Sequence, residues 1–254
     1  IGYTKDFEKV IAMAGKLCYS PVGVDELEEN LSEEKIREFI QNLADMGHES
    51  PLEHCSFSFA VEGISRCCSH QLVRHRIASY SQQSQRYVKE EEGKFEFITP
   101  NIIKEMGEDA VKEYENDMHL IHAMYLKWQE NIKQYVEEND YPTYGMNSTK
   151  VANENARYVL PNAAETKIIV TMNVRSLYNF FSKRCCHRAQ EEIRELADKM
   201  LEICRDISPV LFGKIDAPCV YGHCPEGKLS CKSPKKKPSL YQTSVDQQPY
   251  RGLD

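Results

Sequence analysis

Residues 166–174 read Thr-Lys-Ile-Ile-Val-Thr-Met-Asn-Val and form the clearest predicted strand in the chain. Ile168, Ile169 and Val170 follow one another here, and such β-branched side chains pack well on a pleated surface. The strand ends where Asn173, Val174 and Arg175 open a helix that we expect to continue to about residue 207. Backbone N–H groups at that helix start, beside an asparagine and an arginine, would suit a phosphate group.

The apolar spacing on either side of this strand predicts further helices and strands. Helices are expected over about 5–18, 32–46, 64–74, 105–138 and 154–160, and strands over 55–61 and 95–99. Ser32 suits the N-cap of the second helix, because acidic residues follow it, and Gly47 suits the end of that helix.

These elements predict an α+β fold, a single domain with a mixed or antiparallel sheet flanked by helices. The sequence has no βαβ alternation and no glycine-rich phosphate motif, so a nucleotide would be held by side chains in a non-Rossmann site. From Asp216 onward no apolar period survives. We therefore expect a domain over 1–215 and a Cys- and Lys-rich extension or tail over 216–254.

The composition is that of an ordinary soluble globular protein, with 41% hydrophobic and 28% charged residues. Charges interrupt residues 1–16 and no apolar run is long enough to span a bilayer, so we expect neither a signal peptide nor a membrane segment. The net charge of −7 argues against nucleic-acid binding. The ten cysteines include two adjacent pairs in helical segments, so we expect reduced thiols and a cytoplasmic protein.

The segment 74–86 combines three arginines, a histidine, three serines and three glutamines, with almost no apolar content. Arginine binds phosphates and carboxylates through a rigid, permanently charged fork, so the segment predicts a site for a polyanionic ligand. Further arginines lie at 157, 175, 184 and 188, and their convergence would suit more than one anionic ligand. For any one of them, a surface ion pair is an equally good interpretation.

Arg175 and Arg184 are nine residues apart, which in an unbroken helix places them half a turn from each other. Unless the helix breaks at Lys183, the two side chains cannot serve the same ligand of one site. One of them would face a second ligand or a neighbouring subunit, and this geometry favours active sites shared between chains.

Several blocks of the sequence resemble the flavin-dependent thymidylate synthases. Arg74-His75-Arg76, then seven residues and Ser84, is the family's signature, and the resemblance extends over about residues 5–215. Supporting blocks lie in order at 14–20, 47–54, 156–161, 173–180 and 184–190. The resemblance implies methylation of dUMP to dTMP, with 5,10-methylenetetrahydrofolate as carbon donor and NADPH-reduced FAD as hydride source. It also implies a homotetramer with shared active sites.

The resemblance also implies roles for individual residues. It places FAD against Ser50, Arg74, His75, Arg76, Gln82, Asn173, Val174, Arg175 and Asn179. It places dUMP against Gln71, Leu72, Val73, Arg74, Gln82, Gln83, Ser84, Gln85, Arg86, Arg157 and Arg184. Arg184 is the expected catalytic residue, since a guanidinium beside N3 or O4 of uracil stabilises the charge that develops when C5 is activated. His48 and Tyr87 are candidates for contacts near the folate or flavin ring.

Three positions depart from the family pattern. Gln82 and Gln85 stand where some members carry Glu and Gly, and Arg188 stands where some carry His in the flavin contact. Both glutamines can still form hydrogen bonds, although the charge near the ligand changes. The role of Arg188 stays open.

Two other chemistries compete with this interpretation. A cysteine nucleophile would come from Cys68, Cys185 or Cys186, and Ser84 is a further candidate, but each cysteine suits helix packing and no base is paired with Ser84. Cys219, His223, Cys224 and Cys231 could bind zinc, yet their spacings fit no tight knuckle. We therefore expect no metal, and we expect the run at 235–237 to be a solvated part of the tail.

Overall fold

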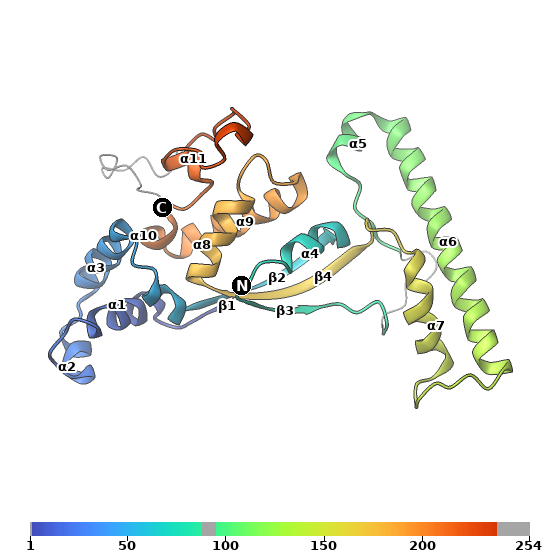
Figure 1. Cartoon of the computed structure of the whole chain (residues 1–254), viewed down its shortest axis with the longest axis horizontal. Helices are drawn as coiled ribbons and strands as arrows, with labels where there is room; N and C mark the ends of the chain where they lie inside the picture. Colours follow the sequence, from blue (N-terminus) through green and yellow to red (C-terminus); the bar gives the residue numbers. More distant parts are fainter. Residues whose placement is uncertain (1, 88–94, 238–254) are drawn as a thin grey trace. The chain divides into compact units, whose positions relative to one another are not determined.

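The computed structural model describes residues 2–87 and 95–237 (Figure 1). Its larger helices are α1 (Phe7–Leu17), α3 (Glu33–Met46), α4 (Arg66–Leu72), α6 (Glu108–Glu138), α7 (Ser148–Ala156), α8 (Val174–Arg184) and α9 (Glu191–Ile207). Shorter ones are α2 (Val24–Glu29), α5 (Asn101–Glu105), α10 (Pro209–Phe212), α11 (Pro218–Tyr221) and the 3-10 turns η1 (Ser50–His54), η2 (Arg157–Val159) and η3 (Gly227–Leu229). The strands are β1 (Gly2–Tyr3), β2 (Ser56–Ser65), β3 (Ala78–Gln82) and β4 (Glu165–Asn173). The predicted α+β class is confirmed.

The four strands form one sheet in the order β1-β2-β4-β3. β1 pairs antiparallel to β2, with Gly2 opposite Ser58. β4 also runs antiparallel to β2: Ser58 and Thr171 share a hydrogen bond near one end, and Glu165 accepts one from the Gly63 N–H near the other. Side chains of β4 alternate, with Ile168, Val170 and Met172 buried, as expected where one face of a strand meets a core.

The chain divides into two compact units. The first holds residues up to Phe59, the segment Arg74–Ser79 and everything from Val170, and the second holds Ala60–Val73 and Tyr80–Ile169. Strands β2, β3 and β4 therefore each begin in one unit and end in the other.

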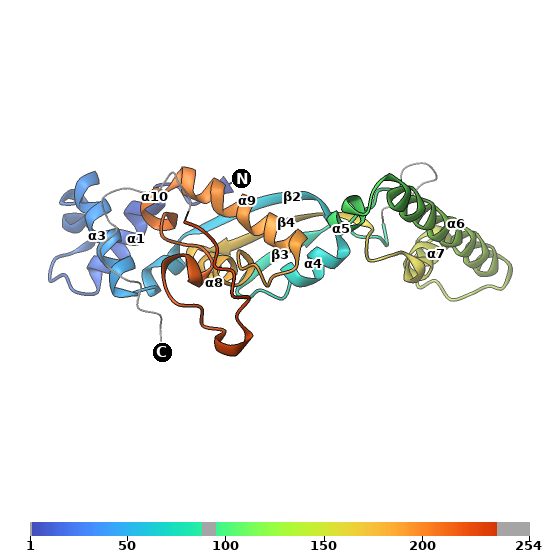
Figure 2. The ribbon, with the colours of Figure 1, turned by 90° about the horizontal axis from the view of Figure 1, so that it is seen from above.

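The first unit is built on aromatic packing beneath helices. Phe212 contacts Phe57, Tyr178 and Phe181 through ring edges, with centroids 5.5–6.3 Å apart. Phe57, Phe181 and Phe212 are fully buried, so they anchor β2, α8 and α10 to one core. α9 lies beside α8 and α10, and α3 lies beside α1 (Figure 2).

In the second unit the long helix α6 packs along α7. A small core joins Phe95, Met118 and Ala164, and the buried ring of His122 stacks on Phe95 with a centroid distance of 4.7 Å. Gln129, which is also buried, donates to the side chain of Asn153 in α7. His122 is thus a packed core residue, as expected for a helix histidine.

The prediction of one helix to about residue 207 is wrong. α8 ends at Arg184 and α9 begins at Glu191, where the Gln190 side chain accepts a hydrogen bond from the Ile193 N–H. An N-cap of this kind competes with helix continuation, and the adjacent cysteines sit in the intervening turn. Ser32 caps α3 as predicted, through the Lys35 N–H, and Gly47 ends that helix at a φ of +69°.

Other boundaries also differ from the sequence prediction. Residues 95–99 form no strand but a single bridge between Phe97 and Ala164, because the Phe95 and Phe97 rings pack against α6 residues. The helix predicted over 154–160 begins earlier, at Ser148, and gives way to η2 at Arg157. Strand β3 lies within the Arg-rich segment and was not predicted, because its polar side chains carry no alternating pattern.

Residues 216–237 belong to the first unit and pack partly against the rest of it. Asp216 and Val220 are buried, and Lys235 forms ion pairs with Asp198 and Asp216. The expectation that residues 235–237 are fully solvated is therefore wrong for Lys235. The domain boundary at 215 stays a prediction, and residues 238–254 of the expected tail lie outside the described part. Across residues 2–87 and 95–237, no helix is long and apolar enough to cross a membrane.

Candidate active site

Arg184 and His75 meet in the first unit although 109 positions separate them in sequence. Arg184, the last residue of α8, donates from Nε to His75 Nε2 over 2.8 Å. The His75 ring stands edge-on to the buried ring of Phe180, with centroids 4.9 Å apart. Burial, and then the Arg184 charge, lowers the pKa of His75 from 6.5 to about 4. His75 is therefore neutral near pH 7, and its Nε2 lone pair holds the guanidinium.

The junction of β4 and α8 forms as the sequence predicts. Asn173 caps the helix, since its Oδ1 accepts a hydrogen bond from the Ser176 N–H at 2.8 Å. Val174 is buried, whereas Arg175 and Asn179 are exposed on the first turns of the helix. The helix start thus presents exposed polar side chains at the positive end of the helix dipole, a combination that suits an anion.

Arg175 forms ion pairs with two carboxylates that flank Ser50. Its Nε lies 3.2 Å from Glu49, and its Nη1 contacts Glu53 in η1. Arg184 bonds instead to His75, and α8 continues unbroken through Lys183. The predicted half-turn offset between the two arginines is confirmed, and each has a different partner. Neither glutamate was singled out from the sequence, because they pair with Arg175 across more than 120 residues.

In the second unit, Glu154 links two of the predicted phosphate-binding arginines. Its carboxylate accepts from Arg86 Nε at 2.8 Å and lies 2.6 Å from Arg86 Nη2, while its backbone carbonyl accepts from Arg157 Nε at 3.3 Å. The carboxylate raises the pKa of the Arg86 guanidinium through its hydrogen bond and charge. Two cationic side chains thus share one anchor at the end of α7. Sequence reasoning missed Glu154, since nothing local marks a partner 68 residues away.

The polar side chains around β3 are held by specific hydrogen bonds. Gln82 donates to Ser69 Oγ at 2.9 Å and to Thr166 Oγ1 at 3.2 Å. Ser84 Oγ accepts from the Arg86 N–H at 3.2 Å, a contact that shapes a turn and activates no nucleophile. Tyr80 donates its hydroxyl to the Leu72 carbonyl at 2.8 Å, and burial raises its pKa to about 12.

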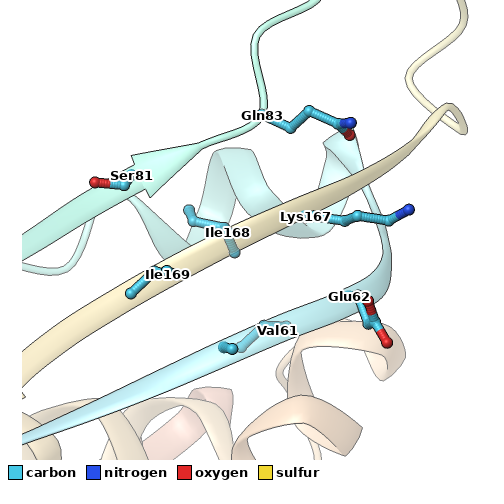
Figure 3. Close-up of a pocket in the computed structure, with 8 residues that line it drawn as sticks. Val61, Glu62, Ser81, Gln83, Lys167, Ile168 and Ile169 are labelled. Atoms are coloured by element: carbon cyan, nitrogen blue, oxygen red, sulfur yellow. The ribbon is translucent and has the colours of Figure 1, made fainter. Parts of the chain in front are cut away.

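A shallow pocket of about 410 Å³ opens over β2, β4 and β3 in the second unit (Figure 3). It is lined by Ala60, Val61, Glu62, Ser81, Gln83, Lys167, Ile168 and Ile169. Gln83 is the one predicted site residue among these. The pocket therefore is not the predicted site as a whole, whose residues lie in both units.

The predicted residues divide between the units almost by ligand. The first unit carries Ser50, Arg74, His75, Arg76, Asn173, Val174, Arg175, Asn179 and Arg184. The second carries Gln71, Leu72, Val73, Gln82, Gln83, Ser84, Gln85, Arg86 and Arg157. Apart from Gln82, the FAD set thus falls in the first unit, and the dUMP set falls in the second apart from Arg74 and Arg184. Leu72 is fully buried, so only its backbone could reach a ligand.

A family model described as thymidylate synthase complementing protein matches residues 1–210. The chain belongs to this family. It is 48% identical over 249 residues to the flavin-dependent thymidylate synthase of Clostridium tetani, with 94% of each chain covered. The protein of the same name from Geobacter sulfurreducens is 45% identical over 229 residues, with 90% of each chain covered. The one from Pyrococcus furiosus is 41% identical over 240 residues, which cover 90% of this chain and 89% of that protein. The resemblance found in the sequence blocks is thus confirmed.

Membership in this family implies FAD, and the side chains of the first unit fit that group. Arg74, Arg76 and Arg175 are exposed there, and guanidinium groups match a pyrophosphate in charge and geometry. The start of α8 adds the positive end of a helix dipole, which favours a negatively charged group without a glycine cradle. Arg175 must exchange part of its contact with Glu49 and Glu53 for the ligand, which costs little for an exposed pair.

The cysteines of the motif blocks suit packing better than nucleophilic attack. Cys68 and Cys185 are buried, and burial raises the pKa of the Cys185 thiol. The thiolate is the nucleophilic form, so this thiol is poorly reactive near neutral pH. The family's flavin chemistry needs no such nucleophile.

Proposed function

We propose that this protein methylates dUMP to dTMP, taking the carbon from 5,10-methylenetetrahydrofolate and the hydride from FAD reduced by NADPH. The match of residues 1–210 to the family model carries this proposal, and three relatives of the same name support it over most of the chain. A homotetramer with shared active sites and a cytoplasmic location are proposed with it, on the resemblance and the composition. We propose no role for nucleic acid or membrane.

We propose that Arg184 stabilises the negative charge that develops over N3, C4 and O4 of uracil when C5 becomes nucleophilic. A fixed positive charge lowers a barrier most when it is oriented before the reaction. The bond from Arg184 Nε to neutral His75 supplies that orientation. His75 is a positioning residue in this proposal.

We assign the dUMP phosphate to Arg86 and Arg157. Because both side chains bond to Glu154, the two cations stay close together. Each side chain is already partly fixed, so it loses less conformational entropy when the ligand binds. Gln71, Leu72, Val73, Gln82, Gln83, Ser84 and Gln85 complete the proposed dUMP contacts, with Arg74 between dUMP and flavin. The bonds from Gln82 to Ser69 and Thr166 hold its side chain in place beside this segment.

We assign FAD to eight residues of the first unit, together with Gln82. They are Ser50, Arg74, His75, Arg76, Asn173, Val174, Arg175 and Asn179. When bound, FAD supplies the hydride, and NADPH is its proposed reductant. The buried Val174 can contribute only backbone atoms, whereas Arg74 and Arg76 offer side chains.

Tritium release from [5-³H]dUMP, in the presence of FAD, NADPH and methylenetetrahydrofolate, tests the proposal. The wild-type chain is expected to release tritium and form dTMP. Arg184→Ala should lower turnover about 100-fold or more while the purified protein keeps its flavin. Arg37→Ala, which removes an exposed guanidinium from α3, is the matched control and should turn over normally. A wild-type protein without flavin would refute the function, and normal turnover by Arg184→Ala would refute the assigned role.

A further inference from the structure

Four of the ten cysteines line one pocket of about 200 Å³ in the first unit. Cys219, Cys224 and Cys231 come from the segment after α10, and Cys186 comes from the turn between α8 and α9. His223 also lines the pocket. The sequence offered only three cysteines and a histidine within thirteen residues, and the fold adds a fourth thiol from a distant turn.

The adjacent pair Cys185 and Cys186 is divided between two environments. Cys185 is buried and lies with Asp198 and Asp216, and their ligand atoms are within 4.8 Å of one another. The Lys235 ammonium already occupies that cluster, 2.6 Å from Asp198 and 3.0 Å from Asp216. Lys235 therefore already supplies a cation to the cluster that contains Cys185, whereas Cys186 lines the pocket with the other three cysteines.

The cysteine-bearing segment is held against the α8–α9 turn at several points. Arg188 pairs with Glu226 at 2.8 Å, and His187 Nδ1 lies 2.9 Å from the Ser233 carbonyl oxygen. Within the segment, Tyr221 donates to the Gly213 carbonyl at 2.8 Å, and Lys235 pairs with Asp198 of α9 at 2.6 Å. The segment between these contacts has little apolar burial of its own, as in small modules that rely on a metal.

We propose that Cys186, Cys219, Cys224 and Cys231 bind one structural zinc ion. Four thiolates are a preferred zinc set, with Zn–S bonds of about 2.3 Å and sulfurs about 3.8 Å apart in a tetrahedron. Lys232 lines the same pocket, and its charge offsets part of the excess negative charge of a zinc ion with four thiolates. Cys186 lies in the turn that follows Arg184, and the other three cysteines lie in the extension. The zinc ion would therefore link this turn to the extension.

The four thiols are not yet at ligand spacing. Among the described residues, Cys185, Asp198 and Asp216 form the one group of three such ligands within 4.8 Å. Metal binding must therefore draw the sulfurs together. Cys231 is exposed and Cys186, Cys219 and Cys224 are half-buried, so their side chains can rotate without breaking a packed core. Coupling of zinc binding to local ordering is the normal behaviour of such sites.

The test is the zinc content of the full chain, purified under reducing conditions from zinc-supplemented medium and measured by mass spectrometry. About one zinc per chain is expected, and a Ser variant at any of the four cysteines should reduce it to background. Cys18→Ser, at an exposed thiol outside the pocket, is the matched control and should keep the ion, as should His223→Ala. Circular dichroism confirms that each variant is folded.

Three outcomes would overturn the proposal. The first is background zinc in the folded wild type after incubation with zinc chloride. The second is full zinc in Cys186→Ser with loss in the other three, which would place the ion within the extension alone. The third is protection of the same thiols by disulfides, seen as failure to alkylate until a reductant is added. Substitution by Co²⁺ gives an independent readout, because tetrahedral thiolate sites produce intense visible bands with this ion.

Discussion

Replacing His75 should change catalysis through Arg184 without touching the guanidinium itself. In His75→Leu the acceptor of the 2.8 Å bond from Arg184 Nε is lost, whereas in His75→Gln the amide oxygen can take its place. A hydrogen bond to a charged group contributes about 1.5–3 kcal/mol, and the lower end applies because both side chains are partly open to solvent. We therefore expect kcat/KM for dUMP to fall about tenfold in His75→Leu and at most about threefold in His75→Gln.

The assay is tritium release at saturating FAD, with flavin content measured in each variant. This control is needed because His75 is also assigned to FAD. Equal losses in the two variants would show that the ring's shape matters and its acceptor does not. Unchanged kcat/KM in a flavin-replete His75→Leu protein would refute the positioning of Arg184 by His75.

The same contact predicts how stability depends on pH. The pKa of His75 is about 4 in the folded protein, whereas its ordinary value is 6.5, so the unfolded chain binds this proton first as the pH falls. Stability is therefore lost between pH 6.5 and about 4. The full difference corresponds to at most about 3.4 kcal/mol, and solvent access reduces it to about 1–2 kcal/mol. The free energy of unfolding is measured in urea at pH 7 and at pH 4.5. It should fall more in the wild type than in His75→Gln, which cannot titrate at this position, and the difference between the two falls is the contribution of His75.

Three further changes test other parts of the structure. Arg86→Ala should raise KM for dUMP about tenfold or more with little change in kcat, in steady-state assays; an unchanged KM would remove Arg86 from the phosphate site. Gly47→Ala should lower the free energy of unfolding by about 1 kcal/mol, because its φ is +69°, whereas Gly2→Ala, where a Cβ meets open space, should change it little. Asp216→Asn should cost about 3 kcal/mol in urea unfolding, since it leaves the buried Arg205 without its carboxylate. A cost below that of Gly47→Ala would contradict this last estimate.

Local patterns sufficed wherever a segment's structure depends on its own residues. The spacing of Phe7, Ile11 and their neighbours predicts α1, and the β-branched run predicts β4. The caps at Ser32 and Asn173 follow from side chains that reach backbone N–H groups three positions on. The arginine blocks also identified the family, through their resemblance to its signature of Arg74-His75-Arg76 followed by Ser84.

Segments that depend on distant partners could not be derived in this way. β3 exists because β4 is available to pair with it, so its polar sequence carries no strand period. Residues 95–99 alternate as a strand would, yet they form no strand, because their aromatic rings pack against side chains of α6. The break after Arg184 depends on the Gln190 cap of the next helix.

The sequence by itself determined the α+β class, the family and the residue types of the site. Only the tertiary structure decided which side chains meet: Arg184 with His75, Arg175 with Glu49 and Glu53, and Arg86 with Glu154. The physical reason is that an ion pair or hydrogen bond acts over a few ångströms of space, whatever the distance along the chain. Residues 68 to 126 positions apart are brought together by strand pairing and core packing, which no local pattern records.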